Sequence, residues 1–327
     1  MDMNIVYASN NDYAKYLGIS MLSLFHNNQN INEIIVYILS QNINSENRRK
    51  LCAIAKHYQR TIEFIDISEF GKLIPFTFNT SGFHPIVLSR LFLCRYIPEE
   101  RKRVLYLDCD IIVNGSIEEL ESLPFGQNYV AAVPELYMPV DKKKRIGLNA
   151  SETYYNAGVL LINLELWRSM DLETVFMDYY QAMNGQLDYN DQDIINHCCK
   201  NKISALDYTY NLSTNLPYFP RYFVKKLQPA YDIPSKDVYA QILRKPAIIH
   251  YMGDERPWIE GNHNKYRKQY GYYAKRSPWK EEPLVQGQQL YMFCYHLLNV
   301  ITLICPWFRV FFSRLIGINK FKWTHKK

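Results

Sequence analysis

The sequence lacks the residue spacings that mark several common kinds of site. Its seven cysteines form no C-x-x-C pair and no repeated pattern. This argues against a zinc site or a disulfide framework and favours a reducing compartment such as the cytoplasm. Neither G-x-G-x-x-G nor G-x-x-x-x-G-K-[ST] occurs, which disfavours a dinucleotide oxidoreductase and a P-loop enzyme. The N-terminus has no basic region followed by an apolar run, so no secretory signal is expected.

Acidic side chains are missing from one part of the chain. Residues 283–327 contain six basic side chains and no Asp or Glu, whereas the other 282 residues carry 32 acidic and 32 basic side chains. A nucleic-acid-binding protein usually carries its excess of basic side chains on the folded body. The neutral body therefore argues against nucleic acid as a partner, and the basic tail needs a separate explanation.

Apolar runs alternate with helical patterns through the first 110 residues. The runs that predict strands are 4–9, 34–39, 61–66 and 104–107, and the patterns that predict helices are 13–25, 44–58 and 86–96. Such alternation is typical of an α/β fold with a Rossmann-like, mostly parallel central sheet flanked by helices. Further strands are predicted at 129–133, 158–163 and 247–251, and the Pro- and Tyr-rich stretch 208–234 is expected to be irregular.

Composition changes after Pro278, which suggests a body over residues 1–278 and a basic, aromatic, helical C-terminal segment over 279–327. Within that segment, Leu290–Phe308 is free of charge and long enough to span a membrane, although His296, Asn299 and Pro306 interrupt it. A span would also separate a cytoplasmic body from its basic tail, against the positive-inside tendency. We favour a helix lying in the plane of an anionic membrane surface, and a span or a helix packed on the body stay as alternatives.

An apolar strand followed by two carboxylates is the strongest local signal. Val104–Leu107 leads into Asp108-Cys109-Asp110, and side chains two apart on a strand share a face, so the two carboxylates should converge. Ligands of open α/β sheets bind outside the carboxyl ends of the strands. Two carboxylates there suit Mn²⁺ or Mg²⁺, which can bridge a diphosphate, although a solvated turn would look the same.

Three further segments carry polar side chains beside apolar runs. His250 ends an apolar run and precedes Gly253 and Arg256, which would suit close approach of a phosphate, although a single histidine there is more often structural. Asp191 and Gln192 precede a helical pattern, where capping alone would explain them. In the third of these segments, residues 155–163, Asn156 before Ala-Gly is the side chain that would reach a ligand.

Taken in order, these segments resemble glycosyltransferase family 8, the retaining enzymes that include bacterial lipopolysaccharide galactosyl- and glucosyltransferases and glycogenin. The resemblance covers about residues 1–275 and rests on the following ordered series: Ile5-Val6-Tyr7-Ala8-Ser9, Arg90, Asp108-Cys109-Asp110, Asn156-Ala157-Gly158, Asp191-Gln192-Asp193 and His250-Tyr251-Met252-Gly253. It implies a GT-A fold, a nucleotide-sugar donor (most often a UDP-hexose) and a Mn²⁺ ion.

The resemblance also implies roles for individual residues. The metal ligands would be Asp108, Asp110 and His250, with Asp108 also beside the donor. The uracil and ribose would lie on Ala8, Ser9, Asn10 and Tyr13, the diphosphate on Gly253 and Arg256, and the donor sugar on Arg90, Asn156, Asp191 and Gln192. Of these, Asp191 and Gln192 would act in catalysis. Asn10 stands where close relatives carry Asp, His84-Pro85 replaces a more usual small polar residue before Arg90, and Arg256 replaces a frequent Lys.

The expected activity is therefore metal-dependent, retaining transfer of galactose or glucose from a UDP-sugar to a saccharide acceptor. A lipid-linked surface-glycan precursor at the inner face of a bacterial cytoplasmic membrane would be such an acceptor. One alternative is a nucleotidyltransferase that makes the nucleotide sugar, which would usually carry an N-terminal Gly-rich loop with a Lys that is absent here. Another is a non-catalytic scaffold that binds nucleotide sugar or membrane.

Overall fold

The computed structural model describes residues 2–229 and 232–312. Its strands are β1 (Asp2–Asn10), β2 (Glu33–Gln41), β3 (Thr61–Asp66), β4 (Arg103–Leu107), β5 (Ile111–Val113), β6 (Val130–Pro134), β7 (Tyr155–Asn163), β8 (Ile203–Ala205), β9 (Leu212–Ser213) and β10 (Ile248–His250).

The α-helices are α1 (Ala14–Asn27), α2 (Ser45–His57), α3 (Leu93–Tyr96), α4 (Glu119–Ser122), α5 (Val140–Arg145), α6 (Leu164–Ser169), α7 (Leu172–Ala182), α8 (Asn190–Cys198), α9 (Arg221–Leu227), α10 (Lys236–Arg244), α11 (Arg267–Ala274) and α12 (Gln289–Ile304). Short 3-10 helices are η1 (Phe70–Leu73), η2 (Pro85–Phe92), η3 (Tyr208–Tyr210) and η4 (Leu216–Tyr218).

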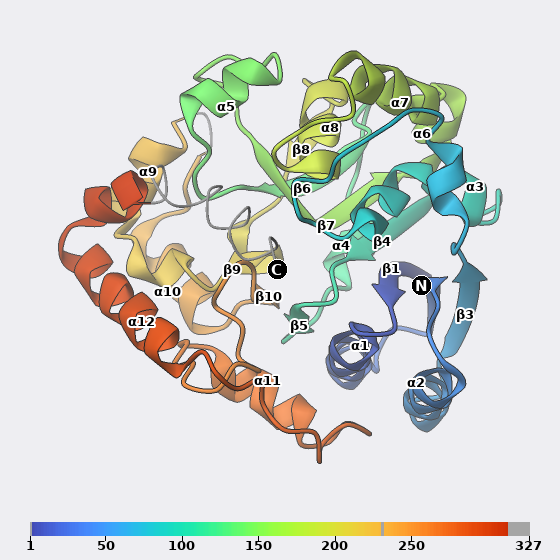
Figure 1. The fold of residues 1–327 in the computed structure, drawn as a ribbon, viewed down its shortest axis with the longest axis horizontal. Coiled ribbons are helices and arrows are strands. Elements are labelled where there is room, and N and C mark those ends of the chain that lie inside the picture. The colour runs from blue at the N-terminus through green and yellow to red at the C-terminus, as the bar shows by residue number, and fades with distance from the viewer. Residues whose placement is uncertain (1, 230–231, 313–327) are drawn as a thin grey trace.

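The large sheet has the strand order β3-β2-β1-β4-β7-β6-β8 and is flanked by helices (Figure 1). The pairs from β3 to β4 are parallel, as is β6 with β8, whereas β7 runs antiparallel to both β4 and β6. The mostly parallel α/β sheet predicted from the alternating pattern is thus confirmed. A small sheet of order β5-β10-β9 stands beside it.

Strand β1 is buried on both faces, which explains its nearly continuous apolar run. Ile5 and Tyr7 belong to a core cluster with residues of α1 and α2, whereas Val6 belongs to a second cluster with residues of η2, α6, α7 and α8. Helices thus cover both faces of the large sheet (Figure 1).

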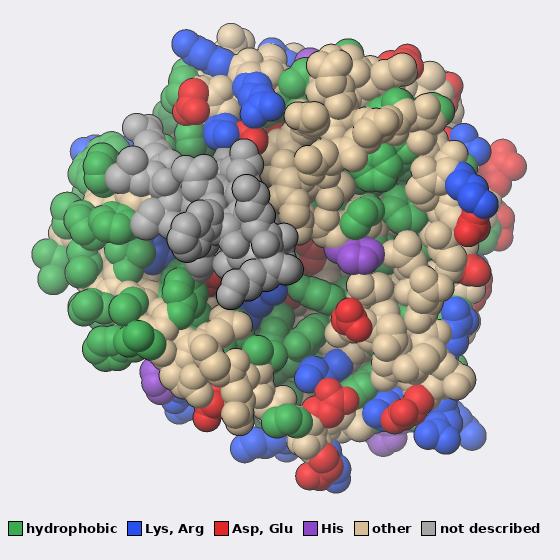
Figure 2. All heavy atoms as spheres, viewed as in Figure 1, with side chains coloured by type: hydrophobic (Ala, Val, Ile, Leu, Met, Phe, Trp, Pro, Cys, Tyr) green, Lys and Arg blue, Asp and Glu red, His purple; other side chains and the backbone are tan. Residues whose placement is uncertain are grey.

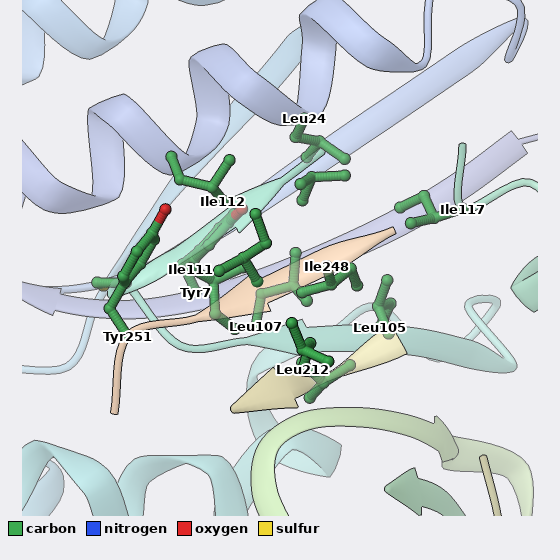
Figure 3. Close-up of a cluster of buried hydrophobic side chains, with 14 of the residues drawn as sticks. Tyr7, Leu24, Leu105, Leu107, Ile111, Ile112, Ile117, Leu212, Ile248 and Tyr251 are labelled. Atoms are coloured by element: carbon green, nitrogen blue, oxygen red, sulfur yellow. The ribbon is translucent and has the colours of Figure 1, made fainter. Parts of the chain in front are cut away.

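The small sheet packs on the large one through an apolar cluster. Figure 3 shows Ile112 of β5, Ile248 of β10 and Leu212 of β9 gathered near Leu105 and Leu107 of β4. This cluster fixes the end of β10 near the end of β4. The polar residues that follow these two strands are thereby brought together.

The structure corrects two predictions. The segment 86–96 is not one α-helix, because Pro85–Phe92 is a 3-10 helix and only Leu93–Tyr96 is α-helical. The stretch 208–234 is not wholly irregular, since it contains β9 and α9.

The C-terminal helix α12 lies along the outside of the body (Figure 1), and its residues Met292, Asn299 and Thr302 are buried. None of the helices within residues 2–229 and 232–312 is both long and apolar enough to cross a membrane. The predicted basic tail falls largely on residues 313–327, which lie outside the described residues.

Candidate functional site

Asp108 and Asp110 lie in a tight turn that carries the chain from the large sheet to the small one. The backbone N–H of Asp108 donates to the carbonyl of Gly158 in β7 at 2.8 Å, and the N–H of Tyr251 donates to the carbonyl of Asp110 at 2.9 Å. Strand β4 ends at Leu107, so the turn, rather than the alternation along a strand, brings the two carboxylates together.

The imidazole of His250 meets these two carboxylates. Its Nε2 lies 3.1 Å from Asp110 Oδ1 and 3.8 Å from Asp108 Oδ2, and the three residues offer ligand atoms that all lie within 4.8 Å of one another. Two carboxylates and one imidazole are a donor set that Mn²⁺ accepts, and the carboxylates also suit Mg²⁺. The residues present therefore fit the divalent cation that the resemblance implies.

Burial and charge act in opposite directions on the protonation of this cluster. Burial alone would lower the pKa of His250, but the carboxylate of Asp110 raises it above its ordinary value. Burial alone would raise the pKa of Asp110, but the attraction of His250 lowers it. The two groups therefore stabilise each other in their charged forms.

A chain of hydrogen bonds behind His250 fixes the orientation of its ring. Its Nδ1 donates to the amide oxygen of Asn211 at 2.9 Å, Asn211 Nδ2 donates to Asn156 Oδ1 at 2.8 Å, and Asn156 Nδ2 donates to Glu135 Oε2 at 2.8 Å. The carboxylate accepts at one end, so each amide is held in one orientation and Nε2 faces the Asp108–Asp110 turn. Burial raises the pKa of Glu135.

Asn156 is therefore a positioning residue in the structure. Its side chain is 8% exposed, and its amide oxygen also accepts the N–H of Gly158 at 2.8 Å. Direct contact between Asn156 and the donor sugar stays a prediction.

Arg90 is the cation at the centre of the site, although its side chain is only 4% exposed. Its Nη2 lies 2.8 Å from Asp108 Oδ1 and its Nε 3.1 Å from Asp191 Oδ2. The guanidinium also donates to the carbonyl of Ala157 and lies 4.1 Å from the ring centre of Tyr106. Burial alone would lower the pKa of Arg90, but Asp108 and Asp191 raise it, so the group is charged.

Asp191 does not cap α8, contrary to the simplest structural interpretation of its position. It pairs with Arg90, and the carboxylate of Asp193 accepts the N–H of Tyr189 at the start of the helix instead, at 2.8 Å. Burial raises the pKa of Asp191 to about 7, although Arg90 opposes that shift. Asp191 is thus a buried carboxylate held by a neighbouring cation.

Gln192 is fixed at both ends of its amide. Its Oε1 accepts the N–H of Ala157 at 2.9 Å, and its Nε2 donates to the hydroxyl of Tyr154 at 3.2 Å. Tyr154 in turn donates to Asp193 at 2.7 Å. The amide of Gln192 is therefore fixed in one orientation.

The predicted nucleotide segment, residues 8–13, comprises the last three residues of β1 and the turn that leads to α1. Asn10 Oδ1 accepts the N–H of Tyr13 at 3.0 Å, so the residue that departs from the family pattern stabilises the turn. Tyr13 is hydrogen-bonded to Arg256. The Nε of Arg256 is buried and has no hydrogen-bond partner among the described residues, as expected for a donor that awaits an anion. Gly253 has a φ of 68°, a conformation that favours glycine.

We expect Gly158→Ala to lower Mn²⁺ affinity by about tenfold or more. A Cβ at Gly158 would lie 2.2 Å from His250 Cε1 and 2.9 Å from Asp108 Oδ2, so the ligand side chains would have to move. Calorimetric titration with MnCl₂ measures the effect. Gly71→Ala is the matched control, because a Cβ there meets no atom of the described residues within 4 Å. Equal Mn²⁺ affinity of the two variants would contradict the proposed cation site.

Sequence reasoning missed Glu135 and Asn211. Glu135 directly follows β6 and lies two residues after the predicted strand 129–133, so the rule that pointed to Asp108 could have found it as well. Asn211 precedes the two-residue strand β9, which is too short to give a periodic pattern. No sequence signal marks its contact with His250.

The sequence of this chain is similar to those of several known proteins. A model of glycosyl transferase family 8 matches residues 4–261. The lipopolysaccharide 1,3-galactosyltransferase of Salmonella typhimurium is 26% identical over 307 residues, covering 90% of this chain and 86% of the relative. An Escherichia coli lipopolysaccharide 1,2-glucosyltransferase is 26% identical over 287 residues, covering 86% and 80%.

A solved structure of the galactosyltransferase LgtC with donor and acceptor sugar analogues matches the fold with a TM-score of 0.70 and 26% identity. The match covers 84% of this chain and 96% of LgtC. The GT-A fold that the family resemblance implied is thereby confirmed.

Proposed function

Because this chain belongs to glycosyltransferase family 8, we propose that it is a retaining hexosyltransferase that uses a UDP-sugar. Galactose or glucose would be moved to a saccharide acceptor, and the acceptor would be a lipid-linked precursor of lipopolysaccharide, capsule or a similar surface glycan. The observation that carries the proposal is the convergence of Asp108, Asp110 and His250 beside Arg90 and Asp191.

The acidic cluster, formed by Asp108, Asp110 and His250, and the nearby Arg256 suit a diphosphate leaving group. Asp108, Asp110 and His250 would hold Mn²⁺, or Mg²⁺ in its place, and the cation would stabilise the negative charge that develops on the departing UDP. Arg256 would donate to the same diphosphate through its Nε, which has no hydrogen-bond partner among the described residues. The neighbouring segment 8–13 would hold the uridine.

The opposite charge develops on the donor sugar, where Asp191 and the side-chain carbonyl of Gln192 would stabilise it. Both groups already have partners, since Asp191 pairs with Arg90 and the Gln192 oxygen accepts the N–H of Ala157. These contacts weaken both groups as nucleophiles. We therefore favour departure and attack on the same face of the sugar, with the leaving phosphate as base. A covalent sugar adduct trapped on Gln192 or Asp191 would overturn that route.

The proposed donor is tested by hydrolysis of UDP-sugars in the absence of an acceptor. UDP-galactose, UDP-glucose and UDP-N-acetylglucosamine are incubated with the protein and MnCl₂, and UDP release is followed by chromatography. Release from a UDP-hexose that stops on chelation of the metal is expected. Binding of UDP without release would favour the scaffold, and formation of nucleotide sugar from UTP and a sugar phosphate would favour the nucleotidyltransferase.

The surface of α12 supports attachment to a membrane. Its side facing the body is partly polar, with Tyr291, Tyr295, Asn299 and Thr302 at helical spacing. An exposed apolar ridge runs along the other side and into the helical stretch that follows, and it consists of Leu290, Phe293, Leu297, Val300, Leu303, Ile304, Trp307, Phe308 and Phe311. Figure 2 shows hydrophobic side chains gathered along this edge of the molecule. An exposed ridge of that extent is typical of a surface covered by a partner or by lipid.

We propose that the ridge, together with the basic residues of segment 283–327, binds the anionic inner face of a bacterial cytoplasmic membrane. The adjacent helix α9 adds exposed Lys225, Lys226 and Tyr222, and its Phe223 packs edge-on against Trp307 with ring centres 4.7 Å apart. The catalytic body would then work in the cytoplasm beside its lipid-linked acceptor.

The triple variant Phe293→Ser/Leu297→Ser/Ile304→Ser should bind vesicles that contain phosphatidylglycerol about thirtyfold less tightly, because it removes three large apolar side chains from the contact. Co-sedimentation with vesicles measures this loss. The double variant Met170→Ser/Val175→Ser is the control, since both residues are exposed and apolar, and α6, which ends just before Met170, and α7, which contains Val175, are on the other side of the molecule from α12 (Figure 1). If the triple variant bound the vesicles as tightly as the unaltered protein, the ridge would not be the membrane contact.

A further inference from the structure

Helix α12 contacts the segment that follows the metal ligand His250. We call residues 251–256 the diphosphate loop, because they include Gly253 and Arg256. The hydroxyl of Tyr291 donates to Asp254 Oδ2 at 2.7 Å, and Asn299 Nδ2 donates to Glu255 Oε1 at 2.5 Å. Two consecutive residues of the loop are thus held by side chains of the C-terminal helix.

Arg309 extends these contacts beyond α12. Its Nη1 donates to Asn299 Oδ1 at 2.8 Å, and its Nη2 donates to Asn215 Oδ1 at 3.2 Å and to the hydroxyl of Tyr295 at 2.6 Å. Asn215 follows β9, whose Ser213 pairs with His250 in the small sheet. The guanidinium therefore connects the C-terminal segment to two segments beside His250. It reaches the diphosphate loop through Asn299, and it bonds directly to Asn215, which follows β9.

The network is buried, so its hydrogen bonds are costly to break. Glu255 is 0% exposed and Asn299 1% exposed. Removing the hydrogen-bond donor of a buried carboxylate destabilises the protein more than removing that of an exposed one, because water does not replace the missing hydrogen bond. Glu255 is thus held in place by Asn299, which is oriented in turn by Arg309.

We propose that Asn299 and Arg309 are positioning residues for donor binding: through Glu255 they hold Arg256 where it binds the diphosphate of the nucleotide sugar. Glu255 and Arg256 are adjacent in sequence, so a shift of the Glu255 side chain moves the backbone that carries the guanidinium. The inference rests on the proposed function, because it assigns the diphosphate to Arg256. It also gives the C-terminal segment a role in donor affinity that is separate from any membrane contact.

The test uses the full-length protein without lipid and measures UDP affinity by calorimetry in the presence of MnCl₂. Asn299→Asp keeps the size of the side chain and the contact with Arg309, but it places a second carboxylate against Glu255. Arg309→Gln removes the charge that orients Asn299. Each variant should bind UDP about tenfold more weakly. In steady-state hydrolysis of a UDP-hexose, KM for the donor should rise more than kcat falls, and Arg309→Lys should recover part of the affinity.

Two controls separate this role from general damage. Arg276→Gln removes a charge from an exposed arginine at the end of α11, and Cys294→Ala alters an exposed position on α12 itself. Both should bind UDP as the unaltered protein does, and circular dichroism at the assay temperature should report folded protein for every variant. Glu255→Gln, which keeps an acceptor for Asn299, takes the place of Asn299→Asp if that variant fails to fold.

The outcomes distinguish the two proposals. An unaltered protein that binds no UDP with Mn²⁺ would overturn both the proposed function and this inference. If the unaltered protein binds UDP and the folded Asn299 and Arg309 variants bind it within twofold as tightly, the positioning role is overturned and the proposed function stands. A fall in UDP affinity confined to these variants would support both.

Discussion

Replacing Asp110 with asparagine is expected to lower Mn²⁺-dependent hydrolysis of the UDP-hexose donor by about a thousandfold. The substitution keeps the shape of the side chain but removes one of the two carboxylates that face His250, so the cation site loses a unit of negative charge. The fold should persist, because the hydrogen bond that anchors this position joins Tyr251 to the backbone carbonyl of residue 110. Hydrolysis assays and calorimetric titration with MnCl₂ measure the two losses.

Asp237→Asn is the matched control for this experiment, since Asp237 is an exposed aspartate in the first turn of α10 and does not belong to the cluster of Asp108, Asp110 and His250. It should retain both Mn²⁺ binding and hydrolysis. Hydrolysis by Asp110→Asn at the unaltered rate would show that the reaction does not depend on this cluster. Loss of hydrolysis with unchanged Mn²⁺ affinity would place the cation elsewhere.

Two neighbouring strands of the large sheet, the second of which leads into Asp108, could be predicted from the sequence because they are strongly apolar. The runs at 4–9 and 104–107 are buried on both faces of the sheet, and this continuous burial is what makes them visible without an alignment. Both are confirmed as β1 and β4. The meeting of His250 with Asp108 and Asp110 came only from the family resemblance, because it depends on the antiparallel pairing of β10 with β5.

What the sequence did not reveal is the set of polar contacts between distant segments. Asn211 reaches His250 from a stretch with no periodic pattern, and Glu255 is held by Asn299, 44 residues further along the chain. Such contacts follow from the packing of elements and leave no local spacing. The tail shows the same limit, because composition alone singled out residues 283–327 and could not indicate that one side of α12 would contact the diphosphate loop.

Arg90 is the position where a single substitution should most affect both stability and activity. Arg90→Met keeps much of the aliphatic volume but leaves Asp108 and Asp191 without their cation. Removal of one partner of a buried ion pair costs about 3–5 kcal/mol of the free energy of unfolding. Hydrolysis of the UDP-hexose should fall as well, because the two carboxylates that Arg90 bridges would no longer be fixed in place. Arg90→Lys, which keeps the charge without the planar fork, should show smaller losses.

The loss of stability caused by Arg90→Met should be larger at high pH than at low pH, because Arg90 stabilises the ionised form of Asp191. Burial raises the pKa of folded Asp191 to about 7 and Arg90 opposes that shift, so removal of Arg90 raises this pKa further, while the unfolded value stays near 3.8. Near pH 6 the Asp191 carboxyl is largely protonated in both folded proteins, and the variant loses mainly the pair with Asp108. As pH rises through 7, Asp191 ionises in the unaltered protein, where Arg90 stabilises it, but resists ionisation in the variant. The variant, in which the folded pKa of Asp191 is higher, therefore continues to lose stability over the pH range between the two folded pKa values. Its additional loss is about 1.4 kcal/mol of the free energy of unfolding for each pH unit between those two values. Urea unfolding at pH 6 and pH 9 should therefore show a larger deficit at pH 9, and an equal deficit at both values would mean that Arg90 does not stabilise the charge of Asp191.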